Sequence, residues 1–162
     1  MIIMNDKYIL MCKEAKEIQE IRKRWPVCFW EDGDLIYLTP NYDPYLKEGI
    51  YSVVDGYIVM ISSPGIYEGD YVGGLDYEDI YEVIWLPRQE DLQKICLLQK
   101  GYGSRFSEFM LLRKFHDWAI DYEYSPFRSL NELWLCFVME TVYGKVWNGK
   151  TWIGSNDNYG FK

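Results

Sequence analysis

Histidine is almost absent from this sequence, and its scarcity bears first on catalysis and metal binding. His116 is the single histidine in 162 residues. On a helix, the positions three and four residues away from it hold Leu112, Arg113, Ala119 and Ile120. None of these side chains is a carboxylate that could orient the imidazole ring, as catalytic and metal-binding histidines require. We therefore expect neither role for His116.

Cysteine is also scarce, and its four positions are far apart. Cys12, Cys28, Cys96 and Cys136 form no Cys-x-x-Cys pair, and each stands among apolar neighbours. With one histidine beside them, they offer no ligand set for a structural zinc ion. We interpret them as free thiols of the core, with a disulfide or a nucleophilic cysteine as the alternatives.

Long apolar runs are missing as well. The longest extends from Leu133 to Met139, whereas roughly 20 apolar residues are needed to cross a bilayer. The first residues, Met1 to Met4, have no basic region before them and no small-residue cleavage site after them, so they lack the layout of a secretory signal. We expect a cytoplasmic protein without a membrane span.

Motifs for phosphate or cation binding are incomplete. Gly101 to Arg105 has two glycines and a base ahead of a predicted helix, but Phe106 stands where a dinucleotide-binding fingerprint needs its third glycine. Asp76, Glu78 and Asp79 offer oxygen ligands, yet their spacing does not match an EF-hand loop. We interpret the first segment as a turn and the second as a solvated acidic loop. The sequence predicts no cofactor, no metal ion and no reaction, which favours a non-catalytic protein over an enzyme.

The sequence does contain enough apolar material for a hydrophobic core. Apolar residues make up 49% and aromatic residues 18% of the chain, too much for a disordered segment. Apolar positions that recur every three or four residues predict helices over residues 5–24, 88–99, 106–122 and 130–143. The last of these begins at the capping box Ser129 to Glu132 and ends at Gly144.

Short apolar runs around turn residues predict β-hairpins. The paired runs are Val27 to Trp30 with Leu35 to Thr39, Ile50 to Val54 with Tyr57 to Ser62, and Lys145 to Trp147 with Lys150 to Ile153. Val83 to Leu86 has the composition of one further, buried strand. In the last hairpin, a two-residue Asn148-Gly149 turn would pair Trp147 with Lys150 and make Trp147 and Trp152 diagonal neighbours in a buried or half-buried clasp.

Together these elements predict an α+β protein. We expect a single domain over residues 1–153, in which an antiparallel or mixed sheet of hairpins packs against three to four helices. Residues 154–162 are polar and are expected to form a loose C-terminal tail. The order of the strands cannot be deduced from the sequence.

Five segments carry a family resemblance, namely Met11 to Ala15, Glu17 to Gln19, Ile84 to Gln93, Ser129 to Leu135 and Gly144 to Gly149. They resemble an uncharacterised family of small proteins encoded by phages and prophages of Gram-positive bacteria. The similarity covers the first predicted helix and residues 83–152, and it leaves residues 27–82 unmatched. No activity is attached to that family, so the resemblance implies a phage accessory role and supplies no catalytic residues.

Negative charge is concentrated in residues 31–82, which we call the acidic stretch. It contains twelve carboxylates and one base, Lys47, so its net charge is −11. The whole chain carries −8, which leaves the remaining residues at +3. Because carboxylates repel phosphates, direct binding of nucleic acid by this stretch is not expected.

The acidic stretch also holds nine of the 15 tyrosines. Tyrosine offers a large contact area with a polar tip, which suits binding surfaces, and carboxylates steer basic proteins toward such a surface. We therefore predict a partner-binding surface made of Tyr67, Glu68, Asp70, Tyr71, Asp76, Tyr77, Glu78, Asp79 and Tyr81.

The leading hypothesis is a non-catalytic, phage-type accessory protein that binds a basic protein partner through this surface. A nucleic-acid-binding host or defence protein, whose groove the carboxylates would fill as mimics of phosphates, is the partner we favour. One alternative is a small-ligand or nucleotide-binding protein or enzyme, with an aromatic pocket lined by Trp85, Trp134 and Trp147. Others are a structural component of the virion, and solvated loops whose charge serves solubility alone.

Overall fold

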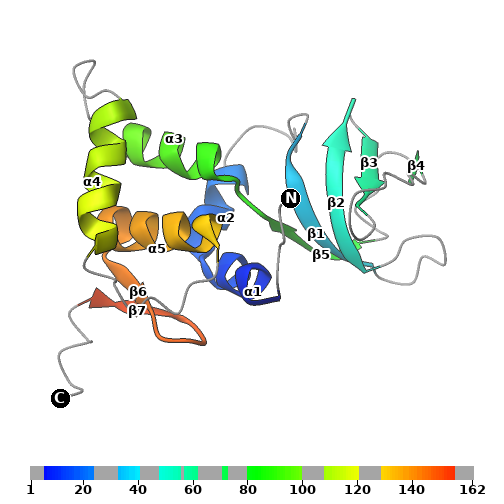
Figure 1. The fold of residues 1–162 in the computed structure, drawn as a ribbon. Helices are drawn as coiled ribbons and strands as arrows, with labels where there is room; N and C mark the ends of the chain where they lie inside the picture. Colours follow the sequence, from blue (N-terminus) through cyan, green and yellow to red (C-terminus); the bar gives the residue numbers. More distant parts are fainter. Residues whose placement is uncertain are drawn as a thin grey trace. The chain divides into compact units, whose positions relative to one another are not determined.

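The computed structural model describes residues 6–23, 33–40, 48–55, 57–61, 71–72, 80–99, 108–120 and 129–155. Helices and antiparallel strands are both present, which confirms the α+β class (Figure 1). The contacts divide the chain into two compact units, Met1–Leu86 and Pro87–Lys162. The single domain predicted over residues 1–153 and the loose tail predicted over residues 154–162 stay predictions.

The first unit contains a five-stranded sheet in the order β4-β3-β2-β1-β5, with every neighbouring pair antiparallel. Its strands are β1 (Leu35–Pro40), β2 (Gly49–Val54), β3 (Tyr57–Met60), β4 (Tyr71–Val72) and β5 (Ile80–Trp85). The predicted hairpin β2-β3 is confirmed, and Asp55 adopts a φ of 50° in its turn. The predicted strand from Val27 to Trp30 lies outside the described residues. The predicted strand near Val83 is confirmed as β5, which pairs with β1.

Side chains on this sheet alternate between two faces, as the pleat of a strand dictates. One face carries a cluster of apolar side chains made of Ile36, Leu38, Tyr51 and Val53, with Met60 and Val83 packed against it. Tyr37 and Thr39 alternate with these core residues along β1, so they lie on the opposite face. Glu82 and Ile84 lie on that opposite face too, because they pair with Thr39 and Tyr37 in the register between β1 and β5.

In the described part of the first unit, the sheet is accompanied by the helices α1 (Asp6–Glu14) and α2 (Lys16–Lys23), and both contact β5. The sequence predicts one continuous helix here, and that prediction is wrong at Ala15. The Gln19 side chain donates from Nε2 to the carbonyl of Cys12 at 3.0 Å. In a continuous α-helix this carbonyl would accept the backbone N–H of Lys16, so the side chain takes the place of a helical hydrogen bond and breaks the helix.

The same glutamine ties α2 to the edge of the sheet. Gln19 Oε1 accepts the backbone N–H of Trp85 at 2.9 Å, and Gln19 Nε2 donates to the Trp85 carbonyl at 2.9 Å. A primary amide offers one donor group and one acceptor in the plane of the side chain. It therefore bonds the outer edge of β5 in the way that a neighbouring strand would.

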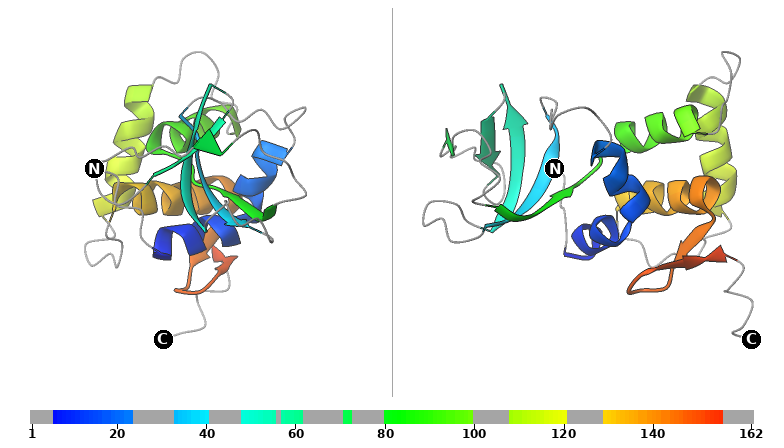
Figure 2. Two further views of the ribbon diagram at one scale, coloured as in Figure 1. Left: turned by 90° about the vertical axis from the view of Figure 1, so that its right-hand side faces the viewer. Right: turned by 180° about the vertical axis from the view of Figure 1, so that it is seen from behind.

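The described residues of the second unit form three helices and a two-stranded sheet. These elements are α3 (Gln89–Gln99), α4 (Glu108–Ile120), α5 (Leu130–Tyr143), β6 (Lys145–Trp147) and β7 (Trp152–Gly154). In both views of Figure 2, α4 crosses the ends of α3 and α5, and all three helices contact one another through α3-α5, α3-α4 and α4-α5 pairs. With α1 and α2, the described residues form five helices, whereas the sequence predicts three to four.

Helix α5 is the central helix of the second unit, as its sequence predicts. Ser129 Oγ accepts the backbone N–H of Glu132 at 3.1 Å, and Gly144 ends the helix with a φ of 65°. Six successive residues, from Trp134 to Met139, are buried. The Phe115 ring from α4 stacks on Trp134 with centroids 3.9 Å apart, so aromatic packing joins α4 to α5.

The final hairpin forms with a different register from the predicted one. Trp147 pairs directly with Trp152, and residues 148–151 make the connection. Asn148 Oδ1 accepts the backbone N–H groups of both Lys150 and Thr151 at 2.9 Å, which stabilises a four-residue turn instead of a two-residue turn. The tryptophans are therefore directly opposite each other, with ring centroids 5.1 Å apart, and Trp152 is buried.

Candidate functional site

Most of the predicted partner-binding surface lies outside the described residues. This applies to Tyr67, Glu68, Asp70, Asp76, Tyr77, Glu78 and Asp79. The backbones of Tyr71 and Tyr81 are described, in β4 and β5. These are the two edge strands of the five-stranded sheet, about 19 Å apart if four strand spacings are counted. The sheet therefore does not bring these two residues together.

Four carboxylates of the acidic stretch belong to the described part of the chain, and they differ in environment. Asp34 is 1% exposed, which excludes its side chain from a binding surface. Asp55 is exposed in the turn between β2 and β3. Glu48 and Glu82 lie at either side of β1, on the face of the sheet opposite the apolar cluster. Of these four carboxylates, Glu48 and Glu82 line a concave surface.

A pocket of about 260 Å³ lies between α1 and the sheet, and we call it the α1 pocket. The helix contributes Asp6, Ile9, Leu10 and Lys13. These positions are spaced by three and four residues, so they share one face of the helix. The opposite face of α1 carries the buried residues Tyr8, Met11 and Cys12. An amphipathic helix thus presents a partly charged face to the sheet.

The sheet forms the other wall of the α1 pocket with Tyr37, Thr39, Glu48, Glu82 and Ile84. Thr39 pairs with Glu82, and Leu38 pairs with Gly49. Glu48, the residue before Gly49, therefore comes next to Thr39 from the other side. Glu48 just before β2, Thr39 of β1 and Glu82 of β5 form a row, with a carboxylate at each end of the row.

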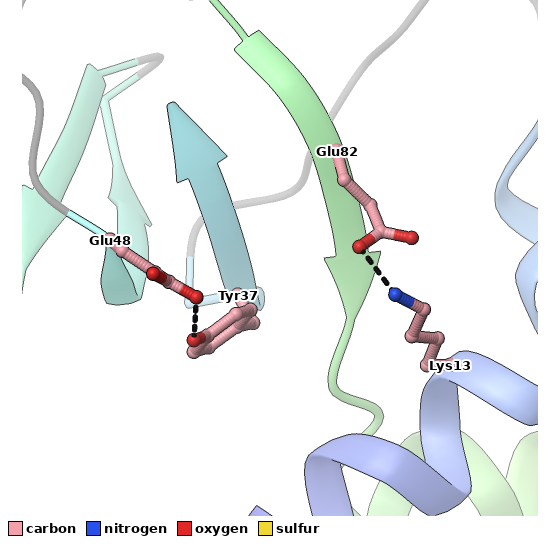
Figure 3. A network of polar contacts seen from close by, with 4 residues as sticks. All are labelled: Lys13, Tyr37, Glu48 and Glu82. Carbon is pink, nitrogen blue, oxygen red and sulfur yellow. Dashed lines mark hydrogen bonds and ion pairs between the residues drawn. The ribbon is translucent and has the colours of Figure 1, made fainter. Parts of the chain in front are cut away.

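Two polar pairs occupy this wall (Figure 3). The Tyr37 hydroxyl donates to Glu48 Oε1 at 2.6 Å. Lys13 Nζ reaches from α1 and donates to Glu82 Oε2 at 2.8 Å. Each carboxylate of the row is thus held by a different side chain, one by a neutral hydroxyl and one by an ammonium group.

The surroundings of the Tyr37 hydroxyl in the α1 pocket raise its pKa. Its hydrogen bond to Glu48 raises the pKa of Tyr37 to about 12, with smaller contributions from burial and from the charges of Glu48, Asp6 and Glu82. All three carboxylates therefore disfavour the phenolate. Tyr37 stays a neutral hydrogen-bond donor at physiological pH.

The composition of the α1 pocket indicates what it is able to bind. Asp6, Glu48 and Glu82 supply three negative charges against one positive charge from Lys13. Ile9 and Ile84 add apolar surface. This combination suits a ligand with a cationic end and an aliphatic stem, because each part of such a ligand meets a matching wall. Nucleotides and other phosphate esters would be repelled.

The sequence shows each of these residues but not their assembly. Glu48 and Glu82 are counted in the acidic stretch, and Asp6 and Lys13 belong to the first predicted helix. The spacing of Asp6, Ile9, Leu10 and Lys13 was the available signal for a second helix face. The pairing of β5 with β1, which places Glu82 opposite Thr39, has no local signal in the sequence.

The tryptophans of the alternative aromatic pocket have other contacts. Trp134 is 1% exposed and stacks on Phe115, and Trp147 packs on Trp152. Trp85 belongs to the first unit, where Gln19 bonds its backbone. An aromatic ligand pocket lined by Trp85, Trp134 and Trp147 stays a prediction.

The remaining candidate side chains are described in part. Cys12, Cys96 and Cys136 are buried free thiols, which confirms the prediction for these three, while Cys28 lies outside the described residues. Burial raises the pKa of the Cys12 thiol far above its ordinary value, against a smaller effect of its hydrogen bond with Tyr8. Since the thiolate is the reactive form, Cys12 is not a nucleophile at neutral pH.

His116 is exposed on α4, and its Nδ1 lies 3.5 Å from Asp117 Oδ1, a neighbour in sequence. Gly101 to Arg105 and Asp76 to Asp79 lie outside the described residues. In the part of the chain that the structure describes, no group of three or more His, Cys, Asp or Glu side chains is arranged to hold a metal ion. None of the described helices has the length and apolar character needed to cross a membrane.

Comparison of this chain with the models of known protein families, with curated proteins and with solved structures finds no match. The resemblance to small phage and prophage proteins stays a prediction.

Proposed function

We propose that this chain is a non-catalytic accessory protein, of the kind encoded by phages, that binds a basic protein partner through its acidic stretch. The α1 pocket is the observation that carries the proposal. There, Glu48 and Glu82 of the acidic stretch and the tyrosine Tyr37 come together with Asp6 at one concave surface. The lining thus combines the two features, carboxylates and tyrosine, that suit a surface for a basic protein.

Negative charge raises the rate at which such a protein associates with a basic partner, and it also makes the binding more selective. A stretch with a net charge of −11 attracts a basic surface over distances of about 10 Å or less at physiological salt, because longer-range interactions are screened. Complementary charge raises the association rate and discourages acidic partners. A protein whose basic groove normally binds nucleic acid fits this description, since carboxylates can take the places of the phosphates that the groove binds. We favour a host or defence protein of this type as the partner.

The experiment that tests the proposal is affinity capture from a host lysate with two variants of equal charge. In the first, Asp70→Asn, Asp76→Asn, Glu78→Gln and Asp79→Asn neutralise part of the predicted surface. In the matched control, Glu20→Gln, Glu90→Gln, Glu108→Gln and Asp117→Asn remove four exposed carboxylates outside the acidic stretch. We expect a basic protein to bind the wild-type chain and the control, and to be lost from the first variant. A partner that binds all three forms equally would refute the proposal.

A further inference from the structure

We propose that the α1 pocket receives the side chain of a single arginine of the partner. The inference rests on the proposed function, because it names the group through which a basic partner would be recognised. It adds a specific role for Lys13, whose ammonium group occupies the cation position next to Glu82.

The geometry of the row across β1 favours arginine. Glu48 and Glu82 stand on either side of Thr39, two strand spacings or about 10 Å apart at the backbone. The Glu48 carboxylate bonds the Tyr37 hydroxyl and the Glu82 carboxylate bonds Lys13 Nζ of α1, so a cation that replaced Lys13 at Glu82 would lie on the same face of the sheet as Glu48 (Figure 3). A guanidinium group carries five N–H donors in one plane and can donate to two carboxylates at once, whereas an ammonium group is a compact point charge.

The size and lining of the α1 pocket match one side chain. Its volume of about 260 Å³ falls below the roughly 300–1,000 Å³ of pockets for drug-sized ligands. Ile9, Leu10 and Ile84 offer apolar surface to an aliphatic stem of three methylene groups. The acidic row then meets the charged end of the same side chain.

The two polar pairs prepare the site in different ways. The hydrogen bond from Tyr37 fixes one oxygen of Glu48, so the carboxylate is already oriented before a ligand arrives. The ion pair between Lys13 and Glu82 is half-exposed, with side-chain exposures of 45% and 32%. Such a pair contributes little to stability, so an incoming guanidinium can replace the ammonium group at Glu82 at small cost. Lys13 therefore competes with the ligand for the Glu82 carboxylate.

The test is a nuclear magnetic resonance titration of the full chain with N-acetyl-arginine amide. N-acetyl-citrulline amide, which has nearly the same shape and no charge, is the matched control ligand. We expect saturable shifts of the backbone amides of Thr39 and Gly49 with the arginine compound and not with the citrulline compound. Equal shifts with both compounds, or none with either, would overturn the inference without requiring any variant to fold.

Variants give a second and independent readout. Glu48→Gln and Glu82→Gln should each weaken the binding of N-acetyl-arginine amide by about fivefold to tenfold, since each removes one charge-assisted hydrogen bond. Lys13→Met should strengthen binding by about twofold or more, because the internal competitor is gone. Glu108→Gln, an exposed carboxylate on α4, should leave the affinity unchanged. Weaker binding by Lys13→Met would contradict the role given to Lys13.

The two proposals fail in different ways. If a captured basic partner binds wild type, Glu48→Gln and Glu82→Gln equally but is lost when Asp70, Asp76, Glu78 and Asp79 are neutralised, the α1 pocket is not its arginine site and the proposed function survives. If no basic partner depends on the acidic stretch, the proposed function fails, and with it the assignment of the arginine to a partner.

Discussion

At the scale of single residues, side chains make some of the hydrogen bonds that backbone groups make elsewhere in the fold. Gln19 is the clearest case, since its amide bonds the carbonyl of Cys12 and both backbone groups of Trp85. Trp85 is 66 residues away in sequence, so the bonds between Gln19 and the edge of β5 have no local signal. Tyr37 has a different role, because its hydroxyl donates to another side chain and orients the Glu48 carboxylate.

Replacing Gln19 should destabilise the first unit. Gln19→Leu keeps the approximate volume but removes three hydrogen bonds, so we expect the free energy of unfolding to fall by about 2–3 kcal/mol. Lys16→Ala, an exposed change on the same helix, should stay within about 0.5 kcal/mol of wild type. Urea denaturation measures both. A Gln19→Leu variant as stable as Lys16→Ala would show that these three hydrogen bonds contribute little to the free energy of unfolding.

The pKa of Tyr37 gives a test of the electrostatics in the α1 pocket. The folded-state pKa of about 12 lies above the ordinary value of about 10, so the folded state retains a proton that the unfolded state loses. The resulting stabilisation is complete below about pH 10 and is lost as the pH rises toward 12. Glu48→Gln removes the main cause and should return the pKa of Tyr37 toward its ordinary value. The measurement is a nuclear magnetic resonance titration of ¹³C-labelled tyrosine rings, in which the signal of Tyr37 is assigned with Tyr37→Phe. A pKa of Tyr37 that is the same in Glu48→Gln and in wild type would contradict the role given to Glu48.

At the scale of elements, local signals predicted well where the interactions themselves are local. The ends of α5 follow from Ser129 and Gly144 because a cap involves residues three or four positions apart. The hairpin β2-β3 follows from its Asp-Gly turn. The hairpin β6-β7 was placed correctly, but its register was wrong, since Asn148 bonds two backbone amides and lengthens the turn.

The N-cap of α5 should contribute measurably to stability. Ser129→Ala removes the acceptor for the backbone N–H of Glu132, and we expect a loss of about 1 kcal/mol in the free energy of unfolding. Ser129→Asp supplies another good cap and should restore most of it. Thermal denaturation followed by circular dichroism compares the three proteins. Equal stability of Ser129→Ala and wild type would indicate that the cap is dispensable.

At the scale of the whole molecule, the sequence predicts how much charge a segment carries but not which charged residues share a surface. The concentration of carboxylates in residues 31–82 can be counted in the sequence. Which of them share a surface cannot, because it depends on strand order: β1 lies between β2 and β5 and so brings Glu48 and Glu82 to one wall. Tyr71 and Tyr81, close in sequence, are on opposite edges of the same sheet. The surface predicted from Tyr67 to Tyr81 stays a prediction, because most of its residues lie outside the described part of the chain.

The measurement that tests the central claim most directly is the affinity of the captured partner for the wild-type chain as a function of ionic strength. Between about 50 mM and about 500 mM sodium chloride the Debye length falls about threefold, so an interaction that depends on the acidic stretch must weaken severalfold. The variant with Asp70, Asp76, Glu78 and Asp79 neutralised should bind more weakly and depend less on salt. A wild-type affinity that is the same at both salt concentrations would contradict the account.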